Sequence, residues 1–277
     1  MTMQHWKQET DDAGIVWLCL DIADEKANVL SSDVLSELST ALDPFAESPP
    51  HGLVIWSGKK DSFVMGANIK EFTSIETAER AYELVRLGQQ LMDKVEDLAC
   101  PTVAAINGVC MGGGLELSMA CDYRIVYKGD KKIIGLPEVK LGLHPGFGGT
   151  VRAVQICGVR AAMSLMLTGN PVTPGKAKAI GLADVLTSED KWRDDARELI
   201  RTQPAKQRAS IVDRLLNLAP ARPLVRNMLL KQVRGKARKE HYPAPYAMID
   251  IWTSEGASPQ TGYEAEAKSF ADLMCTD

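Results

Sequence analysis

The sequence predicts an α/β fold, and three observations lead to that prediction. Short apolar runs with the composition of β-strands alternate with amphipathic stretches of helical period. The chain has 277 residues, of which 45% are hydrophobic, enough for one large core or for one domain with a helical appendage. Beyond about Asp190 the strand patterns stop and helical patterns follow.

The strand-like runs are each bounded by Gly, Pro, Asn or Asp, residues that commonly end strands. These runs are Ile15–Leu20, Leu53–Trp56, Thr102–Ile106 and Tyr123–Tyr127. Helical patterns separate most of them: residues 34–42 follow the possible N-caps Ser31 and Ser32, and residues 82–98 form a second amphipathic stretch. The order predicts stacked strand-and-helix units, although no sequence repeat demonstrates a solenoid.

The C-terminal region is predicted to be helical. Its amphipathic segments are Ile211–Leu218, Leu224–Val233 and Gly262–Met274. Two prolines in Tyr242–Pro245 are expected to interrupt helix before the last of these segments. We therefore divide the chain into a core at residues 1–190 and a helical C-terminal region at residues 191–277.

Charge and patterning argue against several classes of protein. A formal net charge of -4 gives no global attraction to nucleic acid or to an anionic membrane. Apolar runs do not reach the roughly 18 residues of a membrane span, so we do not expect an integral membrane protein. The segment from Met1 to Asp11 is polar and resembles neither a secretory signal nor an Arg-rich transit peptide. We expect a cytoplasmic, bacterial protein, or a mitochondrial one only if a transit peptide has been removed.

Six cysteines are scattered along the chain without CxxC or Cys/His ligand spacing. That distribution favours buried thiols in a reducing compartment over a disulfide framework, and it predicts no metal site.

The most informative segment is NGVCMGGGLEL at residues 107–117, directly after the apolar run Thr102–Ile106. Its three consecutive glycines, Gly112–Gly114, allow backbone N–H groups to approach a ligand without obstruction by Cβ atoms, as an oxyanion site requires. A tight turn with close helix packing, or a phosphate cradle, are the alternatives. The Gly-Lys-Ser/Thr ending of a nucleotide P-loop and the GxGxxG fingerprint are both missing, so we predict no NAD site in this chain.

Two further segments gain meaning only in combination with the first. FVMGANIKEF, at residues 63–72, follows the second strand-like run and could expose a backbone N–H after its glycine. GLPEVKLGLHPGFGGT spans residues 135–150, where Pro137 stiffens the approach to Glu138 and the glycines permit a tight loop before a helix beginning near Thr150.

Together GANIKEF, NGVCMGGGLELSMACDYRI and LPEVKLGLHPGFGGTVR resemble the crotonase, or enoyl-coenzyme A hydratase/isomerase, superfamily, and the likeness extends loosely over residues 16–186. The resemblance implies the crotonase fold, a spiral of stacked ββα units with a helical C-terminal region. It implies that the N–H groups of Ala67 and Gly113 form an oxyanion hole for a thioester carbonyl. It also matches Glu116 and Glu138 to the two hydratase carboxylates, which many relatives that are not hydratases lack.

The chemistry of water addition agrees with these residues. The reaction needs a base for water, a proton for Cα and stabilisation of an enolate-like oxygen. We expect Glu138 to act chiefly as the acid, with Glu116 as the ionised partner that orients and deprotonates water. Two nearby carboxylates repel each other as anions, so their titrations should be coupled.

Five residues are expected to contact the coenzyme A thioester. Lys26 and Ala27 lie in KANVL, which resembles the family segment that lines the coenzyme A entrance; a plain loop before a helix is the alternative. Asn68, Ile69 and Gly112 complete the set. Asn68 stands where the family commonly has Asp, which implies an altered local charge more readily than lost activity.

The tail resembles a narrower family. KARKEHYPAP at residues 236–245 and GYEAEAKSF at residues 262–270 are similar to the α-subunit of the multifunctional fatty-acid oxidation complex. There a linker leads from a hydratase domain to an NAD-dependent 3-hydroxyacyl-coenzyme A dehydrogenase. The resemblance implies an acyl-coenzyme A substrate, no further cofactor in this chain, and as partners the absent dehydrogenase domain and a thiolase β-subunit. A free-standing hydratase with an unusual tail is the alternative.

The resulting expectation is hydration of trans-2-enoyl-coenzyme A to 3-hydroxyacyl-coenzyme A in fatty-acid β-oxidation. Competing functions are a Δ3,Δ2-enoyl-coenzyme A isomerase, which can work with one carboxylate, a crotonase-fold thioester hydrolase or decarboxylase, and a noncatalytic acyl-coenzyme A-binding module.

Overall fold

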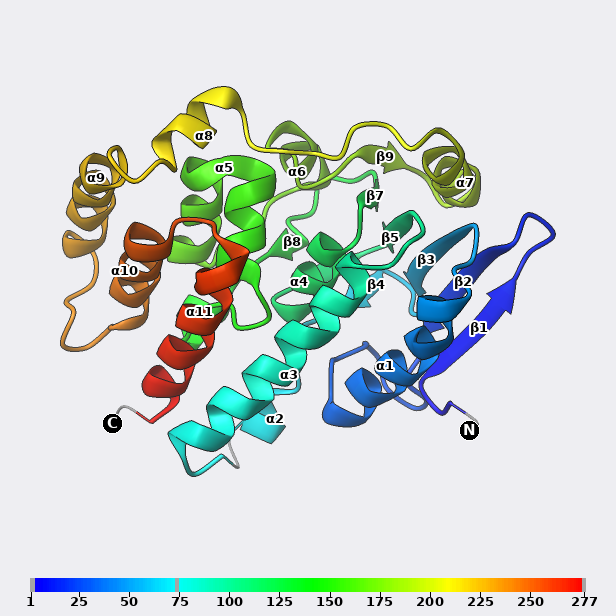
Figure 1. Ribbon diagram of the computed structural model, residues 1–277, viewed down its shortest axis with the longest axis horizontal. Helices are drawn as coiled ribbons and strands as arrows, with labels where there is room; N and C mark the ends of the chain where they lie inside the picture. Colours follow the sequence, from blue (N-terminus) through cyan, green and yellow to red (C-terminus); the bar gives the residue numbers. More distant parts are fainter. Residues whose placement is uncertain (1–2, 73–74, 276–277) are drawn as a thin grey trace. The chain divides into compact units, whose positions relative to one another are not determined.

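A computed structural model describes residues 3–72 and 75–275, which form a mixed α/β structure (Figure 1). The chain divides into two compact units built from interleaved segments. The sheet unit comprises residues up to Asn68, Gln90–Ile134 and Val172–Gln207, and the helical unit comprises Ile69–Gln89, Gly135–Pro171 and the residues from Arg208 onward. The division predicted at residue 190 stays a prediction.

A six-stranded sheet forms the centre of the sheet unit, in the order β1-β2-β3-β5-β7-β9. Its strands are β1 (Trp6–Thr10), β2 (Ile15–Leu20), β3 (Gly52–Ser57), β5 (Thr102–Ile106), β7 (Tyr123–Tyr127) and β9 (Val185–Thr187). Only the β1–β2 pair among these is antiparallel. Every residue of β2 and β5 is buried, as expected for parallel strands covered on both faces.

A second, three-stranded sheet has the order β4-β6-β8. Its strands are β4 (Ser62–Val64), β6 (Val109–Met111) and β8 (Ile134–Gly135). Ser62 of β4 pairs with Val109 of β6 in parallel register, so the segments that follow these two strands leave the sheet at the same edge.

Helices of the sheet unit cover the large sheet. They are α1 (Ser32–Glu47), α4 (Gly113–Ala120), α6 (Pro174–Ala179) and α7 (Trp192–Thr202). The hydroxyl of Ser31 caps α1 by accepting a hydrogen bond from the N–H of Val34, as the sequence predicts. Ala196, Leu199 and Ile200 of α7 join the apolar core on one face of the sheet.

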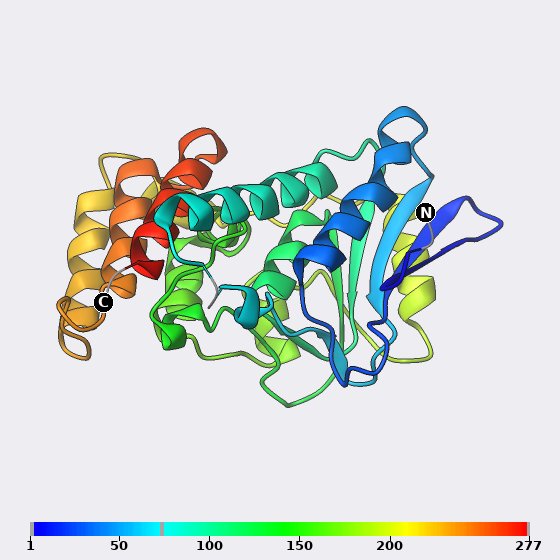
Figure 2. The same ribbon diagram turned by 90° about the horizontal axis from the view of Figure 1, so that it is seen from below.

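The helical unit contains short α2 (Ile69–Phe72), the 3₁₀ helix η1 (Glu138–Leu141), and α3 (Ala78–Glu96), which continues into the sheet unit. Its other helices are α5 (Gly149–Thr168), α8 (Ile211–Leu216), α9 (Arg222–Arg234), α10 (Ala244–Glu255) and α11 (Pro259–Met274). Helix α10 packs against α9, α11 and α5, and Figure 2 shows α9, α10 and α11 side by side.

Helix α5 is the one helix, within the part of the chain that is described, with enough length and apolar character to cross a membrane. Two-thirds (67%) of its most apolar window is buried inside the protein, as in a core helix. Its helical geometry is also interrupted at Gly158. A single helix of this length and composition is weak evidence for a membrane span.

The predicted α/β class is confirmed, and so are the four predicted strands and the predicted helices at both ends of the chain. The helix is interrupted between α9 and α10 at the start of Tyr242–Pro245, as expected, and α10 is a further helix before the one that contains residues 262–274. Pro243 and Pro245 lie at the N-cap and in the first turn of α10, where a missing N–H breaks no intrahelical hydrogen bond.

Candidate active site

The segments after β4 and β6 form the backbone part of the candidate site. A Cβ atom placed on Gly66 would lie 3.5 Å from the carbonyl oxygen of Met111 and 4.0 Å from the backbone nitrogen of Gly113. The turn that carries Ala67 therefore runs beside the start of α4, and both belong to the sheet unit.

Hydrogen bonds to the segment before α1 fix the orientation of the Ala67 peptide. The N–H of Leu30 donates to Gly66 O (2.8 Å), and the N–H of Asn68 donates to Leu30 O (2.9 Å). Successive peptide groups of an extended chain point to opposite sides, so the N–H of Ala67 points away from Leu30. Among the described residues it has no hydrogen-bond acceptor.

Two glycines shape the N-terminus of α4. Gly112, the N-cap, has φ 51° and ψ −127°, a conformation that L side chains rarely adopt. A Cβ atom on Gly114 would lie 2.3 Å from the carbonyl oxygen of Val64, so only glycine permits this approach to β4. As the first residue of α4, Gly113 has an N–H without an intrahelical acceptor.

Glu116 lies on α4 three residues after Gly113, which places the two on the same face of the helix. Only 2% of its surface is exposed, although all the other residues of α4 are small, apolar or a serine. A carboxylate in the first turns of a helix is also stabilised by the helix dipole. Ala67, Gly113 and Glu116 are therefore brought into one region of the sheet unit.

Glu138 belongs to the helical unit and begins η1, with Pro137 as N-cap and Gly142 as a left-handed C-cap. The residue is partly exposed overall, but its Oε2 atom is buried and has no hydrogen-bond partner among the described residues. Burial, with a smaller contribution from the charge of Glu266, raises the pKa of Glu138 to about 7. With that pKa, about half of the Glu138 carboxyl groups carry a proton at pH 7.

Glu266 of α11 is a buried carboxylate that the sequence reasoning did not select. Its Oε1 accepts from the amide of Gln89 (2.9 Å) and the N–H of Gly148 (2.6 Å). Its Oε2 accepts from the N–H (2.9 Å) and hydroxyl (2.5 Å) of Thr150. Burial raises the pKa of Glu266, while these donors oppose the shift by stabilising the charged form. Glu266 thus ties α11 to the loop between η1 and α5.

A signal for Glu266 was present in the sequence. Tyr263, Glu266, Ala267 and Phe270 follow helical spacing, and all four are buried. A single charged residue on an otherwise apolar helix face indicates a buried partner.

His144 anchors the same loop. Its Nδ1 lies 2.7 Å from Pro145 O and its Nε2 lies 3.0 Å from the hydroxyl of Ser269. Burial lowers the pKa of His144 to about 4, so the ring is neutral near pH 7. A neutral ring that donates from Nδ1 and accepts at Nε2 satisfies both partners.

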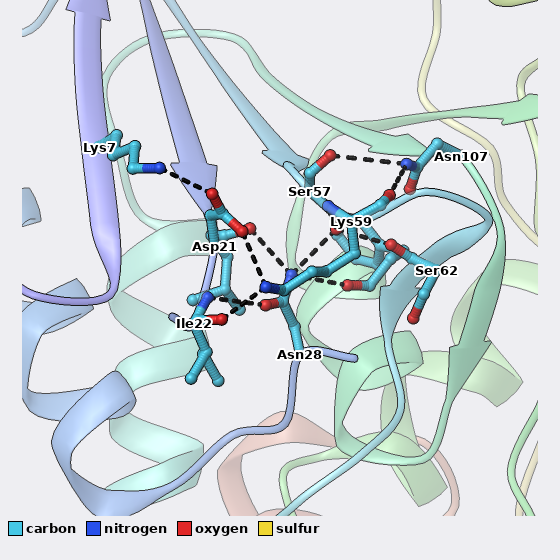
Figure 3. A network of polar contacts seen from close by, with 10 residues as sticks. Lys7, Asp21, Ile22, Asn28, Ser57, Lys59, Ser62 and Asn107 are labelled. Atoms are coloured by element: carbon cyan, nitrogen blue, oxygen red, sulfur yellow. Dashed lines mark hydrogen bonds and ion pairs between the residues drawn. The ribbon is translucent and has the colours of Figure 1, made fainter. Parts of the chain in front are cut away.

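The expected coenzyme A contacts lie on loops. Lys26 is exposed and Ala27 partly exposed, while Asn28 between them and α1 is fully buried. The Asn28 amide donates to Leu20 O (2.8 Å) and to the Ser57 hydroxyl (2.9 Å), tying the loop to the ends of β2 and β3 (Figure 3). Asn28, another residue that the sequence reasoning passed over, therefore has a structural role.

The remaining expected contacts divide between the units. Asn68 is partly exposed and Gly112 buried in the sheet unit, whereas Ile69 begins α2 of the helical unit and is 54% exposed. Within the described ranges no group of three or more His, Cys, Asp and Glu side chains could hold a metal ion. Five of the six cysteines are buried, and Cys275 is exposed.

Comparison with known proteins places these features in a family. Residues 11–236 match the model of the enoyl-CoA hydratase/isomerase family. The fatty acid oxidation complex subunit alpha of Aliivibrio fischeri is 37% identical over 96% of this chain, and that of Shewanella loihica is 39% identical over 96%. The alignments cover only 39% and 38% of those two proteins, so the chain spans about two-fifths of their length.

Solved structures show the same fold. An enoyl-CoA hydratase from Bacillus anthracis is 26% identical and superposes with a TM-score of 0.66, covering 91% of this chain and 90% of its own. An enoyl-CoA hydratase structure from Geobacillus kaustophilus, at 24% identity, gives the same TM-score over 94% of this chain and 95% of its own. The crotonase fold predicted from the sequence is confirmed, and the chain belongs to the enoyl-CoA hydratase/isomerase family.

Proposed function

We propose that this chain hydrates trans-2-enoyl-coenzyme A to 3-hydroxyacyl-coenzyme A. The observation that carries the proposal is the turn between β6 and α4. It offers the N–H of Gly113 beside the turn of Ala67 and carries Glu116 on the same helix face. Two N–H donors suit the oxyanion of an enolised thioester, and a neighbouring carboxylate suits the activation of water.

In the proposed reaction the N–H groups of Ala67 and Gly113 donate to the thioester oxygen, and negative charge develops there as water attacks Cβ. Glu116 accepts a proton from that water. Glu138 donates a proton to Cα, because its raised pKa leaves about half of the carboxyl groups protonated at pH 7. Atoms balance, since one water molecule adds across the double bond.

The coenzyme A portion of the substrate is assigned to the loops around α1 and α2. Exposed Lys26 can pair with a phosphate, and Ala27, Asn68, Ile69 and Gly112 are the proposed neighbours of the thioester arm. No cofactor beyond the substrate is required by this chemistry.

A spectrophotometric assay with crotonyl-coenzyme A tests the proposal. We expect absorbance of the conjugated enoyl thioester to fall and 3-hydroxybutyryl-coenzyme A to appear. Turnover of a 3-enoyl thioester to the 2-enoyl form without hydration would favour the isomerase, and release of free coenzyme A would favour the hydrolase. Binding of the thioester by folded protein without any turnover would favour the acyl-binding module.

The wider setting follows from the relatives, whose name places them in a fatty acid oxidation complex. We propose a role in β-oxidation, in the cytoplasm of a bacterium. The proposed partners are a 3-hydroxyacyl-coenzyme A dehydrogenase domain and a thiolase β-subunit.

Exposed apolar side chains on α8, α9 and the linker to α10 support a docking partner. They include Ile211, Leu215, Leu224, Met228 and Tyr242, each more than half exposed. A separately expressed dehydrogenase domain should protect amides of this region from hydrogen exchange. Unchanged exchange at a saturating concentration of that domain would contradict the partnership.

A further inference from the structure

Glu266 of α11 carries a carboxyl group, and none of its surface is exposed. Its hydrogen-bond donors among the described residues are all uncharged: the amide of Gln89, the N–H of Gly148, and the N–H and hydroxyl of Thr150. All four residues belong to the helical unit. Burying a carboxylate is costly unless the surrounding groups stabilise its charge, so this position indicates a role beyond packing.

The donors around Glu266 favour its ionised form. Three of them are N–H groups, which donate and cannot accept, and together they reach both carboxyl oxygens. Two or three hydrogen bonds of this kind stabilise a carboxylate and so oppose the effect of burial. The hydroxyl of Thr150 adds a fourth. Glu266 therefore loses its proton more readily than a buried carboxyl group without donors.

A cation on α3 fixes the orientation of the Gln89 amide. Arg86, three residues earlier, donates from Nη1 to the amide oxygen of Gln89 at 2.6 Å. The amide nitrogen donates to Tyr263 O and to Glu266 Oε1, both at 2.9 Å. A flipped amide would place its oxygen against two acceptors, so only this orientation satisfies the group. Arg86 thereby holds the Gln89 donor toward Glu266.

Glu138 contrasts with Glu266 in its hydrogen bonds. Its Oε2 atom is buried and has no hydrogen-bond partner among the residues that the structure describes. Burial, followed by the charge of Glu266, raises the pKa of Glu138. Two interacting carboxyl groups resist ionising together, and the first proton leaves the group whose anion is better stabilised. Glu266 is thus expected to ionise before Glu138, and its charge opposes loss of the second proton.

The loop after η1 also connects the backbone of Glu138 to α11. The N–H of Leu143 donates to Glu138 O at 3.1 Å, and the Leu143 side chain packs against the apolar cluster that contains Phe270. The next residue, His144, has Nε2 3.0 Å from the hydroxyl of Ser269. The segment of α11 that carries Glu266 therefore bears on the position of Glu138 as well as on its charge.

Other charged groups on the surrounding elements have partners of their own or are exposed. Lys140 of η1 donates to Asn170 Oδ1 at 3.1 Å. Arg152 of α5 donates to Phe147 O at 3.0 Å and lies 4.8 Å from the centroid of the Tyr263 ring. Asp250 of α10 pairs with Arg226 of α9 at 2.8 Å, and the His144 ring is neutral near pH 7. The other charged side chains of α11 are exposed: Glu264, Lys268 and Asp272.

We propose that Glu266 is a positioning residue for the acid Glu138: as a buried anion it holds the loop after η1 and keeps the proton on Glu138. The inference rests on the proposed role of Glu138 in hydration. Glu266 acts through Glu138 and need not contact the substrate. A residue with only a structural role would hold the loop but would not change the pH at which Glu138 ionises.

Titration of the side-chain carboxyl carbons of the whole chain, followed by ¹³C NMR, tests the inference without substrate. In Glu266→Gln the midpoint for Glu138 should fall by about one pH unit, the size of effect that one interacting charge has in a protein interior. Ser269→Ala is the matched control, because it removes the contact of α11 with His144 but no charge, and it should leave the midpoint unchanged. An unchanged midpoint in folded Glu266→Gln, or equal shifts in both variants, would overturn the proposal.

The order of ionisation gives a test in the unmodified protein. The Glu266 signal should titrate at a lower pH than the Glu138 signal, because only Glu266 has hydrogen-bond donors at both oxygens. Loss of the Glu138 proton before that of Glu266 would overturn the proposal, and this result decides it if Glu266→Gln does not fold.

The pH profile of kcat with crotonyl-coenzyme A gives a second readout. With the midpoint one pH unit lower, the protonated fraction of Glu138 at pH 7 falls from about one half to about one tenth. In Glu266→Gln, kcat at pH 7 should therefore fall about fivefold further below its low-pH plateau than in the unmodified protein. Ser269→Ala should keep the unmodified profile, and a profile in Glu266→Gln that matches it would contradict the proposal. If the chain does not hydrate crotonyl-coenzyme A, the proposed function fails, while the NMR titration still decides the role of Glu266.

Discussion

Glu116 and Glu138 are held in place by different means. Glu116 lies on an α-helix of eight buried residues that begins directly after β6. Glu138 begins a four-residue 3₁₀ helix in which no residue is fully buried. The loop beyond η1 is fixed by Glu266, which is 118 positions further along the chain than Gly148, one of its hydrogen-bond donors.

The difference shows two ways to position a carboxylate. At α4 the backbone positions the carboxylate. The glycine turn before the helix and the close packing of the helix on β4 fix where α4 begins. Around η1, side chains of α11, which is distant in the sequence, position the loop. Glu266 accepts hydrogen bonds from the loop and the start of α5, and Ser269 contacts His144. Substitutions that move the backbone should therefore disturb the region around α4. Substitutions of the anchoring side chains should disturb the loop after η1.

The largest expected effect comes from removing the carboxylates themselves. Glu116→Gln and Glu138→Gln should each keep the fold and lower kcat for hydration by about 10² to 10⁴-fold, because each removes a proton-transfer group. Steady-state kinetics with crotonyl-coenzyme A measures this. In the double variant, kcat should fall by a smaller factor than the product of the two single-variant factors. Turnover near that of the unmodified protein in either folded variant would remove that residue from the mechanism.

The next effect tests the side-chain anchor. Glu266→Gln places an NH₂ group opposite N–H donors, so the free energy of unfolding should fall by about 3 kcal/mol, measured by urea denaturation. Glu264→Gln is the matched control, because Glu264 is exposed on the same helix. Equal stability of the two variants would show that Glu266 does not hold the loop.

A smaller effect tests the backbone contact at α4. Gly114→Ala forces a Cβ atom toward the carbonyl of Val64 and should lower the free energy of unfolding by about 1–3 kcal/mol. Gly129→Ala, where a Cβ atom would meet nothing within 4 Å, should change it little. If thermal and urea unfolding give the two variants the same free energy of unfolding, the close packing of α4 on β4 does not contribute to stability.

The smallest effect is a pH dependence. Because the protonated form of Glu138 is the proposed acid and its pKa is raised to about 7, kcat should fall by about tenfold per pH unit above that value. The same shift stabilises the fold below the ordinary value of 4.5, and this stabilisation is lost as pH rises through about 7. A pH–rate profile that stays flat to pH 9 would contradict this assignment.

The strands buried on both faces were predictable because their sequences are continuous apolar runs. The boundaries of Ile15–Leu20, Thr102–Ile106 and Tyr123–Tyr127 agree with the observed β2, β5 and β7. Edge strand β1 was missed, since four of its five residues are exposed and polar and only pairing with β2 makes it a strand. Strands β4 and β6, three residues each, are too short to show a period.

The sequence by itself determined the α/β class, the glycine turn before α4, the two candidate carboxylates and the resemblance that identified the family, because each of these is written in a contiguous segment. Only the tertiary structure decided that Asn28 joins the ends of β2 and β3 to β4, that Glu266 holds the loop after Glu138, and that side chains of β3, β5, β7 and α7 line a cavity. Those three features depend on partners far apart in the chain, and no local pattern records which donor or aromatic ring will lie opposite them.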